Sequence, residues 1–298
     1  MQKIPYHLLD VFTDCRFGGN PLAIFPDASQ VPPDMMPQIA RELNLSETVF
    51  LFPPDSEGAI PMRIFTPASE LPTAGHPTIG TAYYLASQLT HPPKDGYVDF
   101  WLQQKVGKIR SRAYFEDGKP THTTMQQLLP EFGKIYENRD DFAHLLGLAP
   151  ADLAPTPIQV ISCGVPFVFV PVKTLAAVAR IRFQLHHWEQ VKESLSQAFV
   201  YAFTLEAERK GSDVHGRMFA PEAGISEDPA TGSANGPLGC YLTRYGLKTG
   251  KLVSEQGFEM GRPSLIGIEI EKSESGAIRR VVISGQSVDV GTGLFFMD

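Results

Sequence analysis

Short runs in which hydrophobic and polar residues alternate make up much of the chain, and this pattern is typical of β-strands. Gly, Pro, Asp or Asn residues bound these runs. The polar stretch 118–127 is expected to interrupt the pattern, which then resumes. The predicted strands are 6–12, 22–25, 48–52, 62–65, 97–102, 106–114, 158–162, 167–172, 199–205, 217–219, 265–271, 279–284 and 288–296.

Helical periodicity is less frequent than strand alternation. It predicts a helix over 34–43, with Asp34 as a candidate N-cap, and shorter helices over 142–146 and 188–195. Two further apolar helices end near Leu85 and Leu242. Strands outnumber helices and do not alternate regularly with them, so the pattern favours an α+β fold over a doubly wound one.

The composition is that of a folded protein with no basic excess. A chain of 298 residues fits one large domain or, as the first expectation, two of average size, and 43% hydrophobic residues with 20% charged residues argue against disorder. Lys and Arg number 26 against 33 Asp and Glu, which gives a formal net charge of -7. Nucleic-acid and membrane-surface partners are therefore not expected.

The distribution of polar residues and cysteines favours a cytoplasmic protein without a thiol site. His7 and Asp10 interrupt the apolar region that a signal peptide requires. The longest apolar run, 165–172, is far shorter than the roughly 20 residues of a membrane span. The three cysteines are far apart, so neither a disulfide framework nor a CxxC site is expected.

Two distant segments resemble each other and indicate an internal duplication. When an insertion of three residues is allowed, Glu70, Pro72, Gly75 and Tyr84-Leu85 align with Glu227, Pro229, Gly232 and Tyr241-Leu242. A duplication would explain the length as two copies of one unit. The alternative is a chance similarity between two short segments.

Each copy places a Gly at the start of an apolar helix, where a ligand could approach the main chain. Unpaired N–H groups and the positive end of the helix dipole make such a start a candidate anion site. The alternative is a turn that begins a helix and binds nothing. Neither copy is a P-loop, because Gly80 is followed by Thr81 and Ala82 and no Lys occupies the phosphate position.

Titratable residues accompany these helix starts. The dipole at the first start disfavours a charged His76, which would remain a neutral hydrogen-bonding ring, and Asp228 precedes the second start. Glu47 begins an apolar run, where its pKa would rise toward the range useful for proton transfer. The alternatives are a structural histidine, an N-cap or Asx turn at Asp228, and an exposed Glu47 at a strand start.

The motifs together resemble those of the phenazine biosynthesis PhzF-like family, and the similarity spans nearly the whole chain. The segments that carry it are 17–23, 45–50, 63–67 with Glu70 and Pro72, 74–80, 227–234 and 261–264. The resemblance implies a diaminopimelate epimerase-like fold. Two similar lobes would be related by a pseudo-two-fold axis, each a curled, barrel-like mixed β-sheet around a central α-helix, with the active site in the cleft between them.

The resemblance also implies boundaries and an assembly. The N-terminal lobe would comprise residues 1–117, and the C-terminal strand at about 286–298 would return to it. The C-terminal lobe would comprise 118–285. A homodimer is expected.

Site residues follow from the same resemblance. Glu47 matches the proton-transferring carboxylate of the family, and His76 and Asp228 match its flanking polar residues. The substrate-binding positions are Asn20, Gly75, Gly232 and Ser233. Related epimerases and racemases carry a cysteine directly before each glycine, whereas this chain has Ala74 and Thr231, which excludes a two-thiol mechanism.

The leading hypothesis is a cofactor-independent and metal-independent isomerase or epimerase that shifts a proton on a small carboxylated substrate, with Glu47 as acid and base. The histidines show no HxxxH or HxH arrangement. One alternative is the dihydro-hydroxyanthranilate isomerase of the phenazine pathway. Another is a non-catalytic member that binds a small acid or a protein. A third is a cysteine hydrolase that uses Cys163, although its flanks predict a strand rather than the helix start that activates a thiol.

Overall fold

The computed structural model describes residues 2–195 and 198–297, and their contacts divide the chain into two units. Unit 1 comprises Met1–Gln126, Glu222–Gly224 and Val282–Asp298, and unit 2 comprises Gln127–Pro221 and Ile225–Val281. The chain therefore leaves unit 1 near the end of β8, contributes three residues to it at Glu222–Gly224, and returns to it at Val282 within β17.

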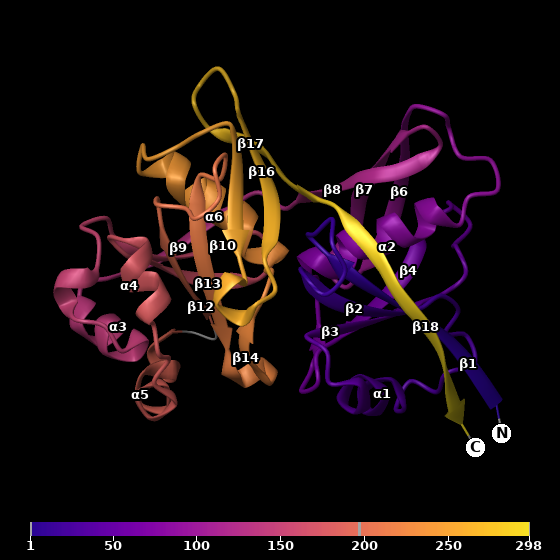
Figure 1. Ribbon diagram of the computed structural model, residues 1–298, viewed down its shortest axis with the longest axis horizontal. Coiled ribbons are helices and arrows are strands. Elements are labelled where there is room, and N and C mark those ends of the chain that lie inside the picture. The colour runs from indigo at the N-terminus through magenta and orange to yellow at the C-terminus, as the bar shows by residue number, and fades with distance from the viewer. Residues whose placement is uncertain (1, 196–197, 298) are drawn as a thin grey trace. The chain divides into compact units, whose positions relative to one another are not determined.

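Unit 1 is built on strands from both ends of the chain. The C-terminal strand β18 lies antiparallel beside the N-terminal strand β1, with Gln2 opposite Met297, so the first and last strands of the chain lie side by side (Figure 1). Its elements are β1 (Gln2–Val11), β2 (Asn20–Phe25), α1 (Met36–Leu43), β3 (Glu47–Leu51), β4 (Ile60–Phe65), β5 (Glu70–Leu71), α2 (Gly75–Ser87), β6 (Gly96–Gln104), β7 (Gly107–Glu116), β8 (Lys119–Gln127) and β18 (Ser287–Met297).

The sheet of unit 1 is mixed and curls around α2. Its strands pair in the order β18-β1-β2-β3-β4-β6-β7-β8, and the β2–β3 and β4–β6 pairs are parallel. α2 contacts β18, β1, β2, β3, β6 and β7. These strands come from both halves of the strand order, so the sheet must bend around the helix for all of them to contact it. All but three of the residues of α2 are buried, as expected for a central helix.

Unit 2 contains most of the helices. Its elements are β9 (Glu131–Tyr136), α3 (Arg139–Leu146), η1 (Pro150–Asp152), β10 (Ile158–Ser162), β11 (Pro166–Pro171), α4 (Leu175–Arg180), α5 (Leu185–Val191), η2 (Lys192–Leu195), β12 (Phe199–Thr204), β13 (Val214–Ala220), β14 (Ile225–Asp228), α6 (Gly232–Arg244), β15 (Lys251–Gln256), η4 (Phe258–Met260) and β16 (Ser264–Lys272). The short helix η3 (Pro221–Ala223) and β17 (Ile278–Gly285) extend across the unit boundaries.

The two units repeat one strand order. In unit 2 the order β9-β10-β11-β12-β13-β15-β16 has the same parallel pairs at the same places, β11–β12 and β13–β15. The register of the second parallel pair repeats as well. In β4–β6 Pro61 lies opposite Gln103, and in β13–β15 His215 lies opposite Glu255, so in each unit the partner is the residue before the last one of its strand. The central helices α2 and α6 both have 13 residues. The internal duplication predicted from short segments is therefore a duplication of the fold.

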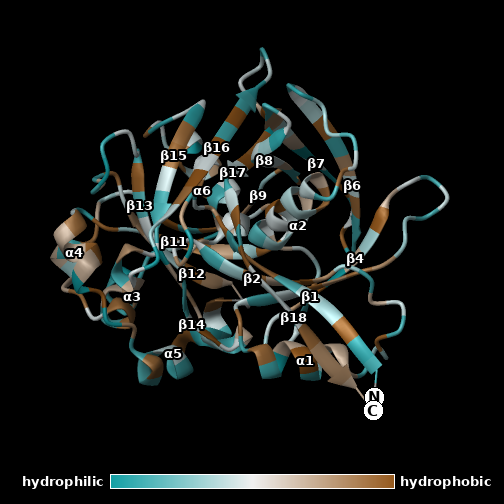
Figure 2. Ribbon diagram, turned by 45° about the vertical axis from the view of Figure 1, so that its right-hand side comes forward, coloured by the Kyte–Doolittle hydropathy of each residue, from teal (hydrophilic) through white to brown (hydrophobic). Residues whose placement is uncertain are grey.

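Strand alternation produces the packing of each sheet. Along β16 the burial pattern BiBiBiBie repeats every second residue, and Figure 2 shows hydrophobic and hydrophilic bands along this strand. The largest buried side chains include Phe25 and Phe50 in unit 1, whose rings stack at 4.8 Å, and Phe169 and Tyr241 in unit 2. Phe25 and Phe50 pack with Met36, Ile39 and Ala40 of α1, whereas Leu22 and Val11 lie against α2 at Gly80.

Two local predictions are wrong. The stretch 118–127 forms strand β8 rather than a break, because its buried positions include polar residues that find partners in the fold, such as Thr123, whose hydroxyl donates to the Ile79 carbonyl of α2. Asp34 does not cap a helix: α1 begins at Met36 after the αR residue Met35 and carries a Pro in its first turn. Residue 117, the expected end of the N-terminal lobe, lies at the turn between the paired strands β7 and β8. The first segment of unit 1 continues to Gln126.

Candidate active site

Glu47 is the first residue of β3 and lies in an apolar part of unit 1. It pairs with Leu22 across the parallel β2–β3 ladder, and all five residues of β3 are buried. Only 8% of Glu47 is exposed. The expectation of a carboxylate against a hydrophobic surface is therefore confirmed, and the exposed strand-start alternative is not.

His76 lies in the first turn of α2 and brings Glu47 and Asn20 together. Its Nε2 atom is 3.3 Å from Oε2 of Glu47, and its Nδ1 atom is 3.1 Å from Nδ2 of Asn20. Asn20 and Glu47 therefore face opposite nitrogens of the ring, and donation from the Asn20 amide to Nδ1 would leave the ring proton on Nε2, on the side of Glu47. These three predicted residues form one cluster, although they come from β2, β3 and α2.

The His76 ring is neutral in this environment. Burial lowers its pKa from 6.5 to about 3, because removing the ring from water disfavours the imidazolium, and a hydrogen bond to the Pro21 backbone opposes this shift only in part. The predicted direction is confirmed. The main cause is burial rather than the helix dipole from which it was predicted.

No side chain caps the start of α2. Ala74 is the N-cap residue in an extended conformation, and its methyl side chain cannot accept the hydrogen bonds of the first-turn N–H groups. Gly75 begins the helix next to His76. Within unit 1 the structure therefore places Gly75, His76, Asn20 and Glu47 in one region, at the positive end of a 13-residue helix.

Asp228 and the start of α6 form a second cluster, in unit 2. Asp228 ends β14, is 3% exposed and accepts a 2.6 Å hydrogen bond from the Thr231 hydroxyl at Oδ2. Thr231 is the N-cap residue of α6, but its side chain makes no capping bond to the helix. Gly232 and Ser233 follow as the first residues of the helix. Each predicted site residue thus lies at or beside the start of a central helix or on the strand next to it.

Two glutamines were missed by the sequence analysis. Gln104 ends β6 and contacts Thr73 before α2 and Thr78 in its first turn, whereas Gln256 ends β15 and contacts Asp228 and Thr231 before α6. A single Gln at a strand end has no distinctive sequence pattern. Only an alignment of the duplication carried beyond the helices would have matched these two positions.

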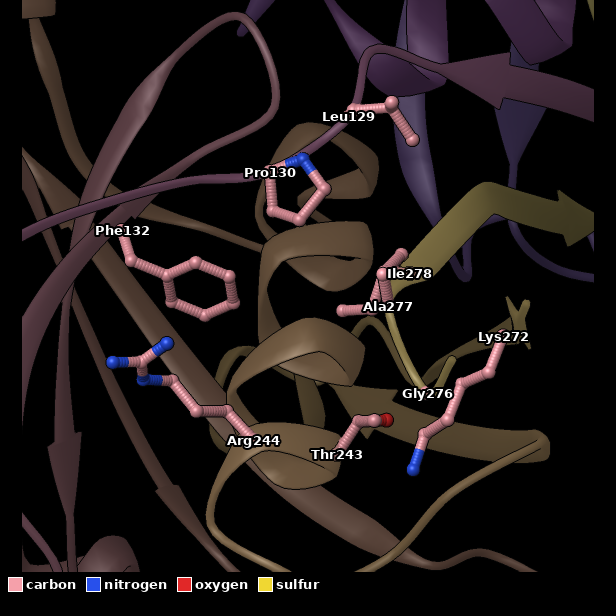
Figure 3. A pocket seen from close by; sticks show the side chains of 9 residues that line it. All are labelled: Leu129, Pro130, Phe132, Thr243, Arg244, Lys272, Gly276, Ala277 and Ile278. Atoms are coloured by element: carbon pink, nitrogen blue, oxygen red, sulfur yellow. The ribbon is translucent and has the colours of Figure 1, made fainter. Parts of the chain in front are cut away.

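A pocket of about 500 Å³ in unit 2 contains none of the predicted site residues. It lies at the C-terminal end of α6, where Figure 3 shows Arg244 beside Phe132 and Lys272 across from Thr243. The remaining lining residues are Leu129, Pro130, Gly276, Ala277 and Ile278. The predicted residues of unit 2 belong to the opposite end of α6.

The structure argues against a cysteine nucleophile. Cys163 and Cys240 are both buried, as expected for small core residues, and the Cys163 thiol is hydrogen-bonded to Cys240. This contact and burial raise the pKa of Cys163, so the reactive thiolate is disfavoured. Cys163 also lies between strands β10 and β11 rather than at a helix start.

Residues 2–195 and 198–297 contain neither a candidate metal-binding cluster nor a candidate membrane-spanning helix. Over these ranges no group of three His, Cys, Asp or Glu side chains is arranged to hold a metal ion. Within the same described residues, no helix is both long enough and apolar enough to cross a membrane.

Known proteins share this architecture over the whole chain. Residues 9–293 match the phenazine biosynthesis-like protein family, PhzC-PhzF. An uncharacterised isomerase from Mesorhizobium japonicum is 37% identical over 100% of both chains. The trans-2,3-dihydro-3-hydroxyanthranilate isomerase of Pseudomonas fluorescens is 34% identical over 97% of this chain and 98% of its own.

Solved structures agree with these sequence relatives. The PhzF-family phenazine biosynthesis protein of Bacillus anthracis has a TM-score of 0.88 and 30% identity over 100% of both chains. A hydroxyproline epimerase from Agrobacterium vitis, solved with bound trans-4-hydroxy-L-proline, shares the fold at a TM-score of 0.64 and 13% identity, over 99% of this chain and 91% of its own. The chain therefore belongs to the phenazine biosynthesis-like PhzC-PhzF family, has its diaminopimelate epimerase-like α+β fold, and is an isomerase.

Proposed function

We propose that the protein moves a proton between two carbons of a small carboxylated substrate, with Glu47 as both base and acid. The observation that carries this proposal is the buried Glu47–His76 contact of 3.3 Å beside the start of α2. A carboxylate held in an apolar site next to a neutral ring is suited to accept and return a proton.

The step balances within the substrate and one carboxyl group. The Glu47 carboxylate takes a proton from an activated C–H bond, and the electron pair of that bond shifts into the adjacent unsaturated system. The Glu47 carboxyl then delivers the same proton to another carbon, or to the other face of the same carbon. No oxidant, reductant, metal ion or cofactor enters this balance, and the proposal includes none.

His76 is proposed to orient Glu47 rather than to accept its proton. With a pKa of about 3, the ring cannot become an imidazolium near neutral pH, so the proton taken from substrate stays on the carboxyl. The Nε2–H group would hold one carboxylate oxygen while Asn20 holds the ring from Nδ1. Positioning of this kind lowers the entropy cost of the reaction.

Substrate binding is proposed for the residues at the two helix starts. Main-chain N–H groups at Gly75, Gly232 and Ser233, together with the Ser233 hydroxyl, are suited to a carboxylate. Asp228 is proposed to bind or polarise a polar substituent of the substrate. The family resemblance assigns these residues to the same reaction as Glu47.

We also propose that the protein is a homodimer and that it is located in the cytoplasm.

Two names among the similar proteins favour a small cyclic amino acid as substrate. One relative is named for trans-2,3-dihydro-3-hydroxyanthranilate and one protein of the same fold was solved with hydroxyproline bound. Dihydro-hydroxyanthranilate isomerisation is therefore the first specific reaction to test. A small difference of one methylene or hydroxyl changes which acid a pocket accepts, so other carboxylates belong in the same panel.

The test is exchange of substrate hydrogen with deuterium from solvent. The protein is incubated in D2O with dihydro-hydroxyanthranilate and a panel of small cyclic and acyclic amino acids, and NMR records isomerisation and deuterium incorporation. Wild type is expected to act on at least one of these acids, and Glu47→Gln to lower the rate by at least about 100-fold, within the range for general acid–base catalysis. The exposed Glu42→Gln serves as the matched control and is expected to retain the wild-type rate.

Two outcomes would contradict the proposal. Equal rates for wild type and Glu47→Gln would exclude Glu47 as the proton carrier. Tight binding of an acid, measured by calorimetry, with neither isomerisation nor exchange at any carbon would instead support a non-catalytic member that binds small acids.

A further inference from the structure

In each unit, a glutamine at an equivalent position hydrogen-bonds to residues that lead into the central helix. The offset between the paired strands is the same in both units, so Gln104 at the end of β6 corresponds to Gln256 at the end of β15. The two strands have little else in common, GYVDFWLQQ against KLVSEQ. A glutamine at this one place in both units suggests a shared task.

Gln256 uses the full hydrogen-bonding capacity of its side chain, and it is 0% exposed. Its Nε2 group donates to the Asp228 carbonyl at 2.6 Å and to the Thr231 hydroxyl at 2.9 Å. Its Oε1 atom accepts from the Thr231 N–H at 3.1 Å and from the Tyr201 hydroxyl at 3.3 Å. A carboxamide offers two donors and one oxygen with two lone pairs, so all four are engaged.

These bonds determine what Thr231 can do. The Thr231 hydroxyl donates to Oδ2 of Asp228 and accepts from Gln256, and it makes no capping bond to α6. A threonine at an N-cap position ordinarily accepts from the helix N–H groups. Gln256 therefore holds Thr231 in an arrangement that orients the Asp228 carboxylate and keeps this hydroxyl away from the first-turn amides.

Gln104 also hydrogen-bonds to residues at the start of its central helix, but through different groups. Its Oε1 accepts from the Thr73 hydroxyl at 2.6 Å, and its Nε2 donates to the Thr78 hydroxyl at 2.7 Å. Thr78 in turn donates to the carbonyl of the N-cap residue Ala74 at 2.6 Å. Asn235 makes the equivalent bond in unit 2, to the Thr231 carbonyl at 2.9 Å. The bonds differ in detail, but both glutamines are tied to the turn that leads into a central helix.

We propose that Gln256 is a positioning residue that orients Asp228 and the first-turn N–H groups of α6. In the same way, Gln104 orients the first-turn N–H groups of α2. This inference rests on the proposed function, since it assigns a purpose to the geometry of the same candidate residues. Neither glutamine is proposed to contact substrate.

The test compares two buried glutamines of unit 2. Gln159 is 2% exposed and makes two hydrogen bonds of its own, to the Gly133 carbonyl and from the Tyr245 hydroxyl, away from the start of α6. Gln256→Met and Gln159→Met both remove a buried carboxamide at nearly constant volume. We expect Gln256→Met to lower kcat/KM on the order of 100-fold, as misplacement of reacting groups by about 1 Å can, and Gln159→Met to lower it less than about threefold.

A second variant separates positioning from stability. Gln256→Glu retains the oxygen that accepts from Thr231 N–H but loses both donors while the introduced carboxyl is ionised. Protonation of that carboxyl restores one donor, so the activity of Gln256→Glu relative to wild type is expected to rise as pH falls. A role in stability alone would not produce this pH dependence when the melting temperatures are matched.

Each result supports or overturns the proposal. Equal loss of kcat/KM in Gln256→Met and Gln159→Met, or a flat relative pH profile for Gln256→Glu, would overturn it. If wild type acts on no acid in the panel, the proposed function fails, and a crystal structure of Gln256→Met decides the positioning role separately. An unchanged turn from Asp228 to Thr231 in that structure would overturn it, and a displaced turn would support it.

Discussion

Arg217 donates two parallel hydrogen bonds to Glu227, from Nε to Oε1 and from Nη2 to Oε2, each 2.7 Å long. Arg63 and Glu70 make the same pair of bonds at 2.8 and 2.9 Å in unit 1. In both units the arginine also lies over a phenylalanine two residues later in its strand. This repeated arrangement connects the strand before each central helix to the short strand that leads into the helix.

The two ion pairs should differ in their effect on stability because they differ in burial. Arg217 is 6% exposed and also donates to the Val178 and Ile181 carbonyls, whereas about a third of the Arg63 side chain is exposed. We expect Arg217→Met to lower the free energy of unfolding by about 3 kcal/mol, since it removes a buried guanidinium from the Glu227 carboxylate and from the Val178 and Ile181 carbonyls at once, whereas Glu70 keeps Lys105 at 2.9 Å when Arg63 is replaced. Arg63→Met should lower it by only about 1 kcal/mol. Urea unfolding measures both, and equal losses would contradict this ranking.

His76 should stay neutral throughout the range in which most histidines titrate. Burial holds its pKa at about 3, so we expect its ring ¹⁵N shifts to be constant from pH 8 to pH 5 and to report a proton on Nε2. The half-buried His122, whose pKa is lowered less, provides an internal comparison in the same spectra. A His76 titration midpoint near 6.5 would contradict this prediction.

The buried charge at His215 should make the protein less stable in alkali. Burial alone would lower the His215 pKa, but Glu259 at 3.0 Å and Glu255 at 2.9 Å raise it above 6.5. A raised folded-state pKa stabilises the protein fully below pH 6.5, and this contribution is lost as pH rises through the folded-state pKa. Urea unfolding at increasing pH from 6 should record the loss.

Glu259→Gln is the control for this pH dependence. It removes one of the two carboxylates that hold the His215 proton, so the loss of stability above pH 6.5 should become smaller. An identical pH dependence in wild type and Glu259→Gln would show that another group is responsible.

Gly80→Ala should destabilise the protein although alanine is the better helix former. A β-carbon at Gly80 would lie 2.6 Å from Cδ2 of Leu22 and 2.8 Å from Cγ2 of Val11, both of which are fully buried. We expect a loss of about 1–3 kcal/mol in the free energy of unfolding, typical of overpacking. The exposed Ser87→Ala in the same helix should change it by less than about 0.5 kcal/mol. A more stable Gly80→Ala variant would contradict the close packing of α2.

The cysteines should differ in their reactivity toward iodoacetamide. Cys15 is exposed, whereas Cys163 and Cys240 are buried, and the pKa of Cys163 is raised. In the native protein we expect alkylation at Cys15 only, and at all three positions after unfolding, as measured by peptide mass spectrometry. Rapid native labelling of Cys163 would revive the cysteine-nucleophile alternative.

Much of this protein can be read from local sequence patterns. Strand 158–162 was predicted as it occurs, and the glycines that begin α2 and α6 were placed correctly, because alternation and helix-start residues act over a few neighbours in the chain. The same segments carried the family motifs and, with them, the fold. Glu47, His76 and Asn20 could be named as candidates for this reason.

Tertiary structure alone decided how these candidates meet and what their surroundings do to them. The contact between His76 and Glu47, and a His76 pKa near 3, depend on strands and a helix that are far apart in sequence. Strand β8 and the ties from Gln104 and Gln256 were not predicted because polar residues become structural only when the fold supplies buried partners. A hydrogen bond between distant residues depends on both partners at once, and local pattern records only one of them.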